Sequence, residues 1–249
     1  MLISIITVCY NRSKIIKACI ESVLKQDYPN IEYIIIDGNS NDGTTEIIKS
    51  YGNKITKVIS EPDKGMYDAI NKGLAIAKGQ VVGLMHSDDV FYDNSVVSKI
   101  ADCFKKNSNN VEAIYGNGIY VTNDHKEKKV RNRVGGNYDF NKIKKGWLPL
   151  HPTVYIKKAV IERYGNYNLG FKIASDTEFL LRYLYKYKIR IAYLDIYIVK
   201  MRMGGLSTDH KRALEVFKED YSIYKLHGIP AFKATLMKKI SALTEYLQA

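Results

Sequence analysis

Cysteine is scarce in this 249-residue sequence: Cys9, Cys19 and Cys103 are the only three, and none lies in a CxxC pair. This spacing indicates neither a zinc site nor a disulfide framework. No apolar run approaches the roughly 20 residues that a membrane-spanning helix needs. Residues 1–8 lack the basic start and the small-residue cleavage site of a signal peptide. We therefore expect a cytoplasmic location.

Two common nucleotide-binding loops are also missing. Neither a Gly-x-Gly-x-x-Gly motif nor a Walker lysine follows the first apolar run, where the sequence reads Cys9-Tyr-Asn-Arg-Ser13. A dinucleotide site and a P-loop are therefore disfavoured. A nucleotidyltransferase for sugar nucleotides stays open as an alternative, although a Gly-rich loop with a basic residue would be expected at this position.

Acidic residues are outnumbered, 26 against 38 Lys and Arg, and the formal net charge is +12. Such a surplus favours an anionic partner, which can be nucleic acid, anionic lipid or a phosphate-bearing substrate, unless the lysines are only solvated surface. The sequence has no RNP-like segment, zinc finger or helix-turn-helix signature, so we expect no nucleic-acid partner. A basic protein that binds nucleic acid or an anionic surface without catalysis is the second alternative.

Apolar periodicity predicts alternating strands and helices in the first third of the chain. Strands are expected over 2–8, 31–36, 57–60 and 79–87, of which the first and the last are expected to be buried. Helices are expected over 15–26, 47–51 and 67–77, with Ser13 as an N-cap. This βαβαβαβ order predicts a parallel α/β sheet with right-handed crossovers.

The later segments are more varied. We expect a helix over 94–104, one or two strands over 111–121, a strand over 189–199, and helices over 214–226 and 231–247. Residues 126–145 hold eight Lys or Arg, and they predict either a solvated, mobile loop or a lid that meets phosphate or anionic lipid. For the last helix, core packing, a homodimer contact and a membrane-surface contact all stay open.

Polar side chains follow each of the four predicted strands. They are Thr7, Tyr10 and Asn11, then Asp37, then Glu61 and Asp63, and finally Asp88 and Asp89. Because the carboxyl ends of parallel strands meet at one edge of a sheet, these residues predict a shared pocket. Carboxylates there suit Mn²⁺ or Mg²⁺, which keeps some waters and takes further ligands from a phosphate. For any one of them alone, turn or helix-cap chemistry is the alternative.

Four stretches carry a family resemblance. They are Thr7-Val-Cys-Tyr-Asn11, Asp37-Gly-Asn-Ser-Asn-Asp-Gly-Thr44, Asp63-Lys-Gly-Met-Tyr-Asp-Ala-Ile-Asn-Lys-Gly73 and Ser87-Asp-Asp89. In this order they resemble the family 2 inverting glycosyltransferases, of the kind that assembles bacterial O-antigen, capsular or exopolysaccharide repeat units. The resemblance is close over residues 1–120 and continues to about residue 208. It implies the GT-A fold, an α/β, Rossmann-like mixed sheet with flanking helices, here with a C-terminal helical extension.

The resemblance implies roles for residues on the donor side. Thr7, Tyr10 and Asp37 would receive the base, Asp88 would be the DxD carboxylate on the ribose or phosphate side, and Asp89 would bind the metal. Further donor-binding residues in the matching stretches are Asn11, Asp63, Asp68 and Asn71. The family often has an acid or Asn two places before Asp88, where this chain has His86. The imidazole could donate to a hydroxyl or simply pack.

On the acceptor side, the resemblance makes Asp176 the catalytic base, although an Asp at a helix start is more usually a cap. Glu178 is the second candidate for the base, and His151 would border the acceptor cleft. The residue before Asp176 is Ser175, where the family commonly has Glu. Residues 201–207 resemble a Gly-Gly-x-Ser segment that closes over the donor diphosphate, which Arg202 could neutralise.

These expectations combine into one function. Residues 1–207 would form the glycosyltransferase domain, with 1–120 binding the nucleotide sugar and 121–207 the acceptor, and residues 208–249 the helical extension. The enzyme would transfer a hexosyl or N-acetylhexosaminyl group, with metal and with inversion, from a UDP-linked donor. The acceptor would be a glycan hydroxyl, in a lipid-linked oligosaccharide of surface polysaccharide synthesis. No residue identifies the sugar.

Overall fold

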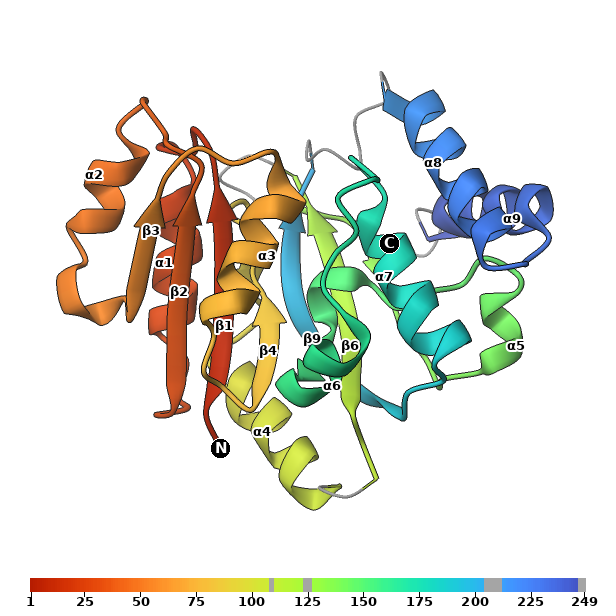
Figure 1. Cartoon of the computed structure of the whole chain (residues 1–249). Helices are drawn as coiled ribbons and strands as arrows, with labels where there is room; N and C mark the ends of the chain where they lie inside the picture. Colours follow the sequence, from red (N-terminus) through yellow and green to blue (C-terminus); the bar gives the residue numbers. More distant parts are fainter. Residues whose placement is uncertain (108–109, 123–126, 204–211, 246–249) are drawn as a thin grey trace.

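The computed structural model describes residues 1–107, 110–122, 127–203 and 212–245. Its first four strands are parallel, in the spatial order β3-β2-β1-β4 (Figure 1). Their bounds are Ile3–Cys9 for β1, Ile31–Asp37 for β2, Lys57–Ser60 for β3 and Val81–Leu84 for β4. The connecting helices are α1 (Ile16–Leu24), α2 (Thr44–Lys49) and α3 (Met66–Ile76), with a 3₁₀ turn at Gly52–Lys54. The predicted parallel α/β arrangement is therefore confirmed.

The sheet continues with mixed strand directions. Strand β8 (Tyr155–Lys157) runs antiparallel between β4 and β6 (Ala113–Val121), and β9 (Ile191–Arg202) lies parallel to β6. Two short strands, β5 (Val90–Phe91) and β7 (Lys129–Arg133), pair with β9 and β6. Gly83 allows β8 to lie so close, because a Cβ there would be 2.1 Å from the ring of Tyr155.

Helices cover both faces of the sheet. Apolar side chains of α1, α2 and α4 (Val96–Lys106) form the core on one face. Those of α3, α6 (Lys158–Tyr164) and α7 (Ser175–Leu181) form it on the other. In Figure 1, α3 lies in front of the strands and α1 behind them. The remaining turns are α5 (Phe140–Ile143), a 3₁₀ turn at His151–Thr153 and a π-helical turn at Arg182–Lys186.

The two C-terminal helices pack into the core that contains α7. They are α8 (Ala213–Leu226) and α9 (Ala231–Thr244), and their residues Ile223, Tyr224 and Ala234 are fully buried. Phe232, Leu236 and Ile240 on α9 are exposed, so one face of this helix packs inward and the opposite face meets solvent. Within the described residues, none of the helices is long and apolar enough to cross a membrane.

Two local predictions are wrong. The basic stretch is not a mobile loop over its described part, because it forms β7 and α5, and Arg131 is buried against Glu245 at 2.6 Å. A salt-bridge partner more than 100 residues away allows this one arginine of the strand to be buried. Ser13 does not cap α1, whose N-cap residue is Ile15. Instead, the Ser13 N–H donates to Asp42 Oδ2 at 3.0 Å.

Candidate active site

The carboxylate of Asp37, at the end of β2, is fully buried in a ring of polar groups. It accepts hydrogen bonds from the N–H and hydroxyl of Ser40, at 3.0 and 2.5 Å, and from the hydroxyls of Ser60 and Thr45, at 2.6 and 3.3 Å. Burial alone would raise the pKa of Asp37, but the hydrogen bonds from Ser40 and Ser60 lower it below its ordinary value. Asp37 thus stays ionised and ties the loop after β2 to the end of β3.

An exposed aromatic ring and a carboxylate flank the start of the same loop. Tyr10 is 57% exposed. A Cβ at Gly38 would lie 2.5 Å from Asp63 Oδ2 and 3.4 Å from Tyr10 Cδ2, so glycine leaves room between them. Asn11 shapes this loop: its φ is 53° and its Oδ1 accepts the N–H of Asn41 at 3.0 Å. Tyr10 and Asp63 therefore lie on either side of Gly38 at the start of this loop.

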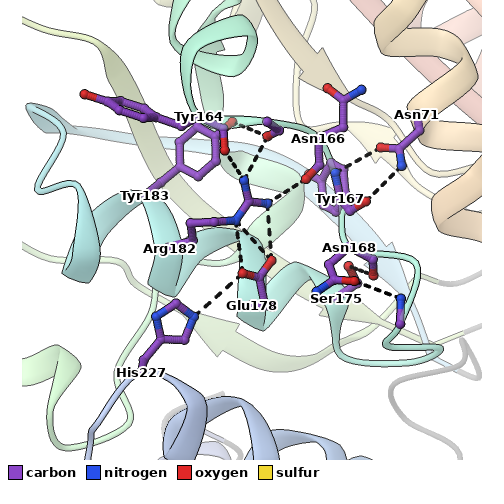
Figure 2. A network of polar contacts seen from close by, with 12 residues as sticks. Asn71, Tyr164, Asn166, Tyr167, Asn168, Ser175, Glu178, Arg182, Tyr183 and His227 are labelled. Carbon is purple, nitrogen blue, oxygen red and sulfur yellow. Dashed lines mark hydrogen bonds and ion pairs between the residues drawn. The ribbon is translucent and has the colours of Figure 1, made fainter.

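Three residues assigned to the donor have other partners. Thr7 is fully buried, and its hydroxyl lies 3.8 Å from Cys19 Sγ on α1 and 3.2 Å from Tyr33 Oη on β2. The carboxylate of Asp68 accepts the N–H of Lys64 at 3.0 Å. The amide of Asn71 bonds both backbone groups of Tyr167, at 2.9 and 3.0 Å (Figure 2). In the structure, the hydrogen bonds of Thr7, Asp68 and Asn71 are thus made to other parts of the chain.

The loop after β4 carries the buried carboxylate of Asp89. Asp89 is 2% exposed, and its Oδ2 has no hydrogen bond within the described residues. Burial raises the pKa of Asp89 well above its ordinary value and the charge of Asp88 adds to this, whereas Arg202 at the end of β9 lowers it. Arg202 also donates to Glu127 Oε1 at 3.1 Å.

These features fit a cation bound mainly through its substrate. The described residues contain no group of three or more His, Cys, Asp or Glu that could hold a metal ion by themselves. A site that uses one or two carboxylates and completes its coordination with phosphate oxygens and water is typical of Mg²⁺ and similar hard cations. Asp89, with the partly exposed Asp88 beside it, is such a donor set.

Asp176 lies in the first turn of α7 and is partly exposed. Its Oδ1 accepts the N–H of Thr177 at 2.8 Å and lies 3.4 Å from the hydroxyl of Tyr67, which also donates to the carbonyl of Ile173 at 2.7 Å. Tyr67 comes from α3, within the stretch 63–73 that carried the resemblance, and sequence reasoning gave it no role.

Two histidines lie beside Asp176. The rings of His86 and His151 are 5.9 Å apart, and His151 Nε2 is 2.6 Å from the hydroxyl of Tyr167. Burial lowers the pKa of His151 to about 4, although the charge of Asp176 opposes this. Burial likewise lowers the pKa of His86, against the charges of Asp88 and Asp176. Both imidazoles are therefore neutral near pH 7, and nothing in the sequence singled out Tyr167 as their neighbour.

Glu178 belongs to a salt-bridge network under this site (Figure 2). Its Oε1 accepts Arg182 Nε at 3.0 Å and lies 3.7 Å from His227 Nε2. The same guanidinium donates to the carbonyl of Tyr164 at the end of α6 and to those of Gly165 and Asn166 in the loop before α7. Burial would raise the pKa of Glu178, but the neighbouring imidazole of His227 and the hydrogen bonds from Arg182 lower it. This geometry favours a structural role for Glu178 over that of a base.

The sequence and the fold match known proteins. The model of Glycosyl transferase family 2 matches residues 4–175. Glycosyltransferase GlyG of Streptococcus pneumoniae serotype 4 is 26% identical over 270 residues, which cover 99% of this chain and 88% of that protein. The loop residues 204–207, predicted to close over the diphosphate, lie outside the described part of the chain.

Solved structures share the fold at low identity. Staphylococcus aureus TarS 1–349 in complex with UDP-GlcNAc matches with a TM-score of 0.71 and 20% identity, over 91% of this chain and 65% of that one. The chain thus spans slightly less than two thirds of that structure. Mannosyltransferase PcManGT from Pyrobaculum calidifontis, in complex with GDP-Man and Mn²⁺, matches with a TM-score of 0.67 and 16% identity, over 95% and 68% of the two chains. The chain is a member of glycosyl transferase family 2 and has the GT-A fold.

Proposed function

We propose that this protein is a metal-dependent, inverting glycosyltransferase that moves a hexosyl or N-acetylhexosaminyl group from a UDP-linked donor to a glycan hydroxyl. One arrangement carries the proposal: His86, two residues before Asp88, lies 5.9 Å ring to ring from His151, and the charge of Asp176 reaches both imidazoles. A donor-side acid from the end of β4 and an acid from α7 therefore border a common space. Transfer needs this arrangement, because the leaving group and the acceptor lie on opposite sides of the sugar.

On the donor side, Asp89 would hold Mn²⁺ or Mg²⁺, with Asp88 beside it, and Tyr10 and Asp63 would contact the nucleoside. The bound cation supplies charge stabilisation to the diphosphate as the bond from the sugar to its oxygen breaks. Arg202 brings a guanidinium to the same place, where it can offset the charge of the leaving group.

On the acceptor side, Asp176 would take the proton from the attacking hydroxyl. Both hydrogen bonds found for this carboxylate within the described residues go to Oδ1, which leaves Oδ2 to receive the proton. The neutral rings of His86 and His151 would line the acceptor cleft and could bond hydroxyl groups without a charge of their own. Attack in line with the leaving group inverts the anomeric centre.

These roles divide the chain into three segments. We propose that residues 1–120 bind the donor, that 121–207 bind the acceptor, and that 208–249 form an extension that adjoins the acceptor side. Asp37, Asn11, Thr7, Asp68 and Asn71 would then act indirectly, by shaping the loops around the donor.

We further propose a lipid-linked acceptor and peripheral contact with an anionic membrane at its cytoplasmic face. Phe232, Leu236 and Ile240 on α9 are 64%, 42% and 43% exposed, and their spacing of four residues places them on one helix face. Lys233, also exposed, lies among them. The chain has a formal net charge of +12. An anionic lipid surface therefore attracts this face, whereas a second copy of the chain would be repelled.

Thermal unfolding with nucleotide sugars tests the proposal. UDP sugars with Mn²⁺ should raise the melting temperature, the protection should disappear without the metal, and Asp89→Ala should lose it. The sugar that gives the largest shift is then assayed for transfer. Protection that persists unchanged in Asp89→Ala contradicts the metal role. Pyrophosphate release from UTP and a sugar phosphate would instead identify a nucleotidyltransferase.

A further inference from the structure

A carboxylate from α8 binds three consecutive backbone amides in front of α7. Oε1 of Glu219 accepts the N–H of Lys172 at 2.9 Å, and Oε2 accepts those of Ile173 and Ala174 at 2.9 and 2.8 Å. Hydrogen bonds from backbone N–H groups to an ionised carboxylate are stronger than those between neutral groups. Glu219 therefore fixes residues 172–174, which lead directly to Asp176.

The same short segment is held from the opposite side. Tyr67 donates to the carbonyl of Ile173 at 2.7 Å, while Glu219 takes the N–H of that residue. The first helical residue, Ser175, donates its hydroxyl to the carbonyl of Asn168 at 2.8 Å (Figure 2). α7 has no side-chain hydrogen bond from its own N-cap residue, Ala174. Glu219, which belongs to α8, thus binds the backbone amides of residues 172–174 directly before α7.

The partly exposed Lys238 of α9 contacts the residue that follows Asp176. Nζ of Lys238 donates to Thr177 Oγ1 at 2.8 Å and to both oxygens of Asp220, at 2.7 and 2.9 Å. Burial alone would lower the pKa of Lys238, but the charge of Asp220 raises it above its ordinary value, so the ammonium stays charged. Thr177 directly follows Asp176, and its N–H donates to the Asp176 carboxylate.

We propose that Glu219 and Lys238 are positioning residues that hold Asp176 in its catalytic orientation, so that α8 and α9 complete the active site. This inference rests on the proposed role of Asp176 as the base. The two residues do not touch the sugar in this scheme. They act on the segment before Asp176 and on the residue after it. Their contacts matter because a small displacement of a catalytic group lowers the rate of the reaction.

The first test compares Glu219→Ala with Glu215→Ala. Glu215 lies one turn earlier on α8, is exposed and pairs only with Arg212 at 3.3 Å among the described residues, so it is the matched control. We expect Glu219→Ala to lower kcat by about 10- to 100-fold, with UDP affinity and donor KM unchanged. Glu215→Ala should keep wild-type kcat. Glu219→Gln, which keeps one acceptor oxygen of the right reach, should recover part of the loss.

Hydrogen exchange gives a readout that needs no turnover. In Glu219→Ala the amides of residues 172–174 should exchange faster, whereas those of β1, β2 and β4 should keep their protection. Thr177→Val tests the second contact, because it removes the hydroxyl and leaves the bond between Lys238 and Asp220 intact. We expect a kcat about tenfold below wild type in this variant and no change in donor KM.

The outcomes separate this inference from the proposed base. If Asp176→Asn is inactive but Glu219→Ala keeps normal kcat, the positioning role is wrong and the base stands. If Asp176→Asn turns over normally, the base assignment fails and the inference fails with it. If Glu219→Ala weakens donor binding as much as kcat, or speeds exchange throughout the sheet, Glu219 only stabilises the fold and the positioning role is again wrong.

Discussion

The two sides of the candidate site are built differently. On the donor side, Asp37 takes its hydrogen bonds from Cys9, Ser40, Thr45 and Ser60, all within 28 residues along the chain. On the acceptor side, Tyr67 reaches the Asp176 carboxylate across 109 residues, and Lys238 reaches Thr177 across 61. Local sequence thus shapes the donor side, whereas the acceptor side exists only after distant elements have packed.

The buried charges differ in the same way. Asp89 on the donor side has a buried oxygen without a partner within the described residues, and its raised pKa shows the cost of that charge. On the acceptor side, Glu178 is paired with Arg182, and Asp220 with Lys238. We infer that a bound ligand completes the polar contacts of the donor side. The acceptor side is instead a rigid support, because its buried charges are already paired.

The largest expected effect separates chemistry from donor binding. Asp176→Asn should lower kcat by about 10²- to 10⁴-fold, because the amide cannot accept the proton. UDP affinity, measured by calorimetry with Mn²⁺, should stay within twofold of wild type, because the donor side is intact. Asp102→Asn, the same change at an exposed position on α4, should have no effect. Transfer near the wild-type rate in Asp176→Asn would remove the base assignment.

The next largest effect tests whether the pair of Arg182 and Glu178 stabilises the fold on the acceptor side. Arg182→Met leaves the buried Glu178 carboxylate without its main partner and frees the carbonyls of the loop before α7. Removing one partner of a buried pair typically costs about 3–5 kcal/mol, and we expect that loss in the free energy of unfolding from urea titration. Arg163→Met, at an exposed position on α6, should change it by less than about 0.5 kcal/mol. A loss equally small in Arg182→Met would mean that the network does not support the fold.

Much of the donor half could be predicted from sequence. The strands β1, β2 and β4 are buried apolar runs, and the rule that parallel strands end at one edge placed Asp37, Asp88 and Asp89. The direction of Thr7 was missed, although side chains alternate along a strand and its buried neighbours could have shown that it faces α1.

The acceptor half could not be predicted in this way. Arg131 looked like part of a charged loop, and only its pairing with Glu245, 114 residues later, explains a buried arginine in β7. Glu219 reads as one more charge on an amphipathic helix, because nothing local indicates that it binds amides 45–47 residues earlier. Helical periodicity gives the buried face of α8 but not the element against which that face packs.

A smaller effect depends on pH and concerns His151, which is neutral in the folded protein. The pKa of His151 is lowered from 6.5 to about 4, so the unfolded chain binds a proton between these values that the folded chain does not. Stability must therefore fall as pH drops below about 6.5, by at most about 2 kcal/mol at pH 5 for this one group. His151→Gln should reduce this slope in urea unfolding, and His86 should maintain the rest. An unchanged slope contradicts a buried, neutral His151.

This pH window also distinguishes the two sides. Asp37 has a lowered pKa, so its contribution to stability is present above the ordinary value of 3.8 and is lost only as pH falls below it. Asp37→Asn should therefore leave the slope between pH 5 and 6.5 unchanged.

The smallest effect on the fold concerns the exposed face of α9. Phe232→Ser combined with Ile240→Ser should change the free energy of unfolding by less than about 0.5 kcal/mol, because both side chains already meet solvent. The same change should weaken binding to phosphatidylglycerol vesicles by about tenfold or more in sedimentation, because partial burial of each side chain in lipid is lost. Val58→Ser, exposed on β3 of the donor side, is the matched control and should bind like wild type. If the protein instead sediments as a dimer that the α9 substitutions dissociate, this face binds a second copy, because a membrane face leaves the protein monomeric without lipid.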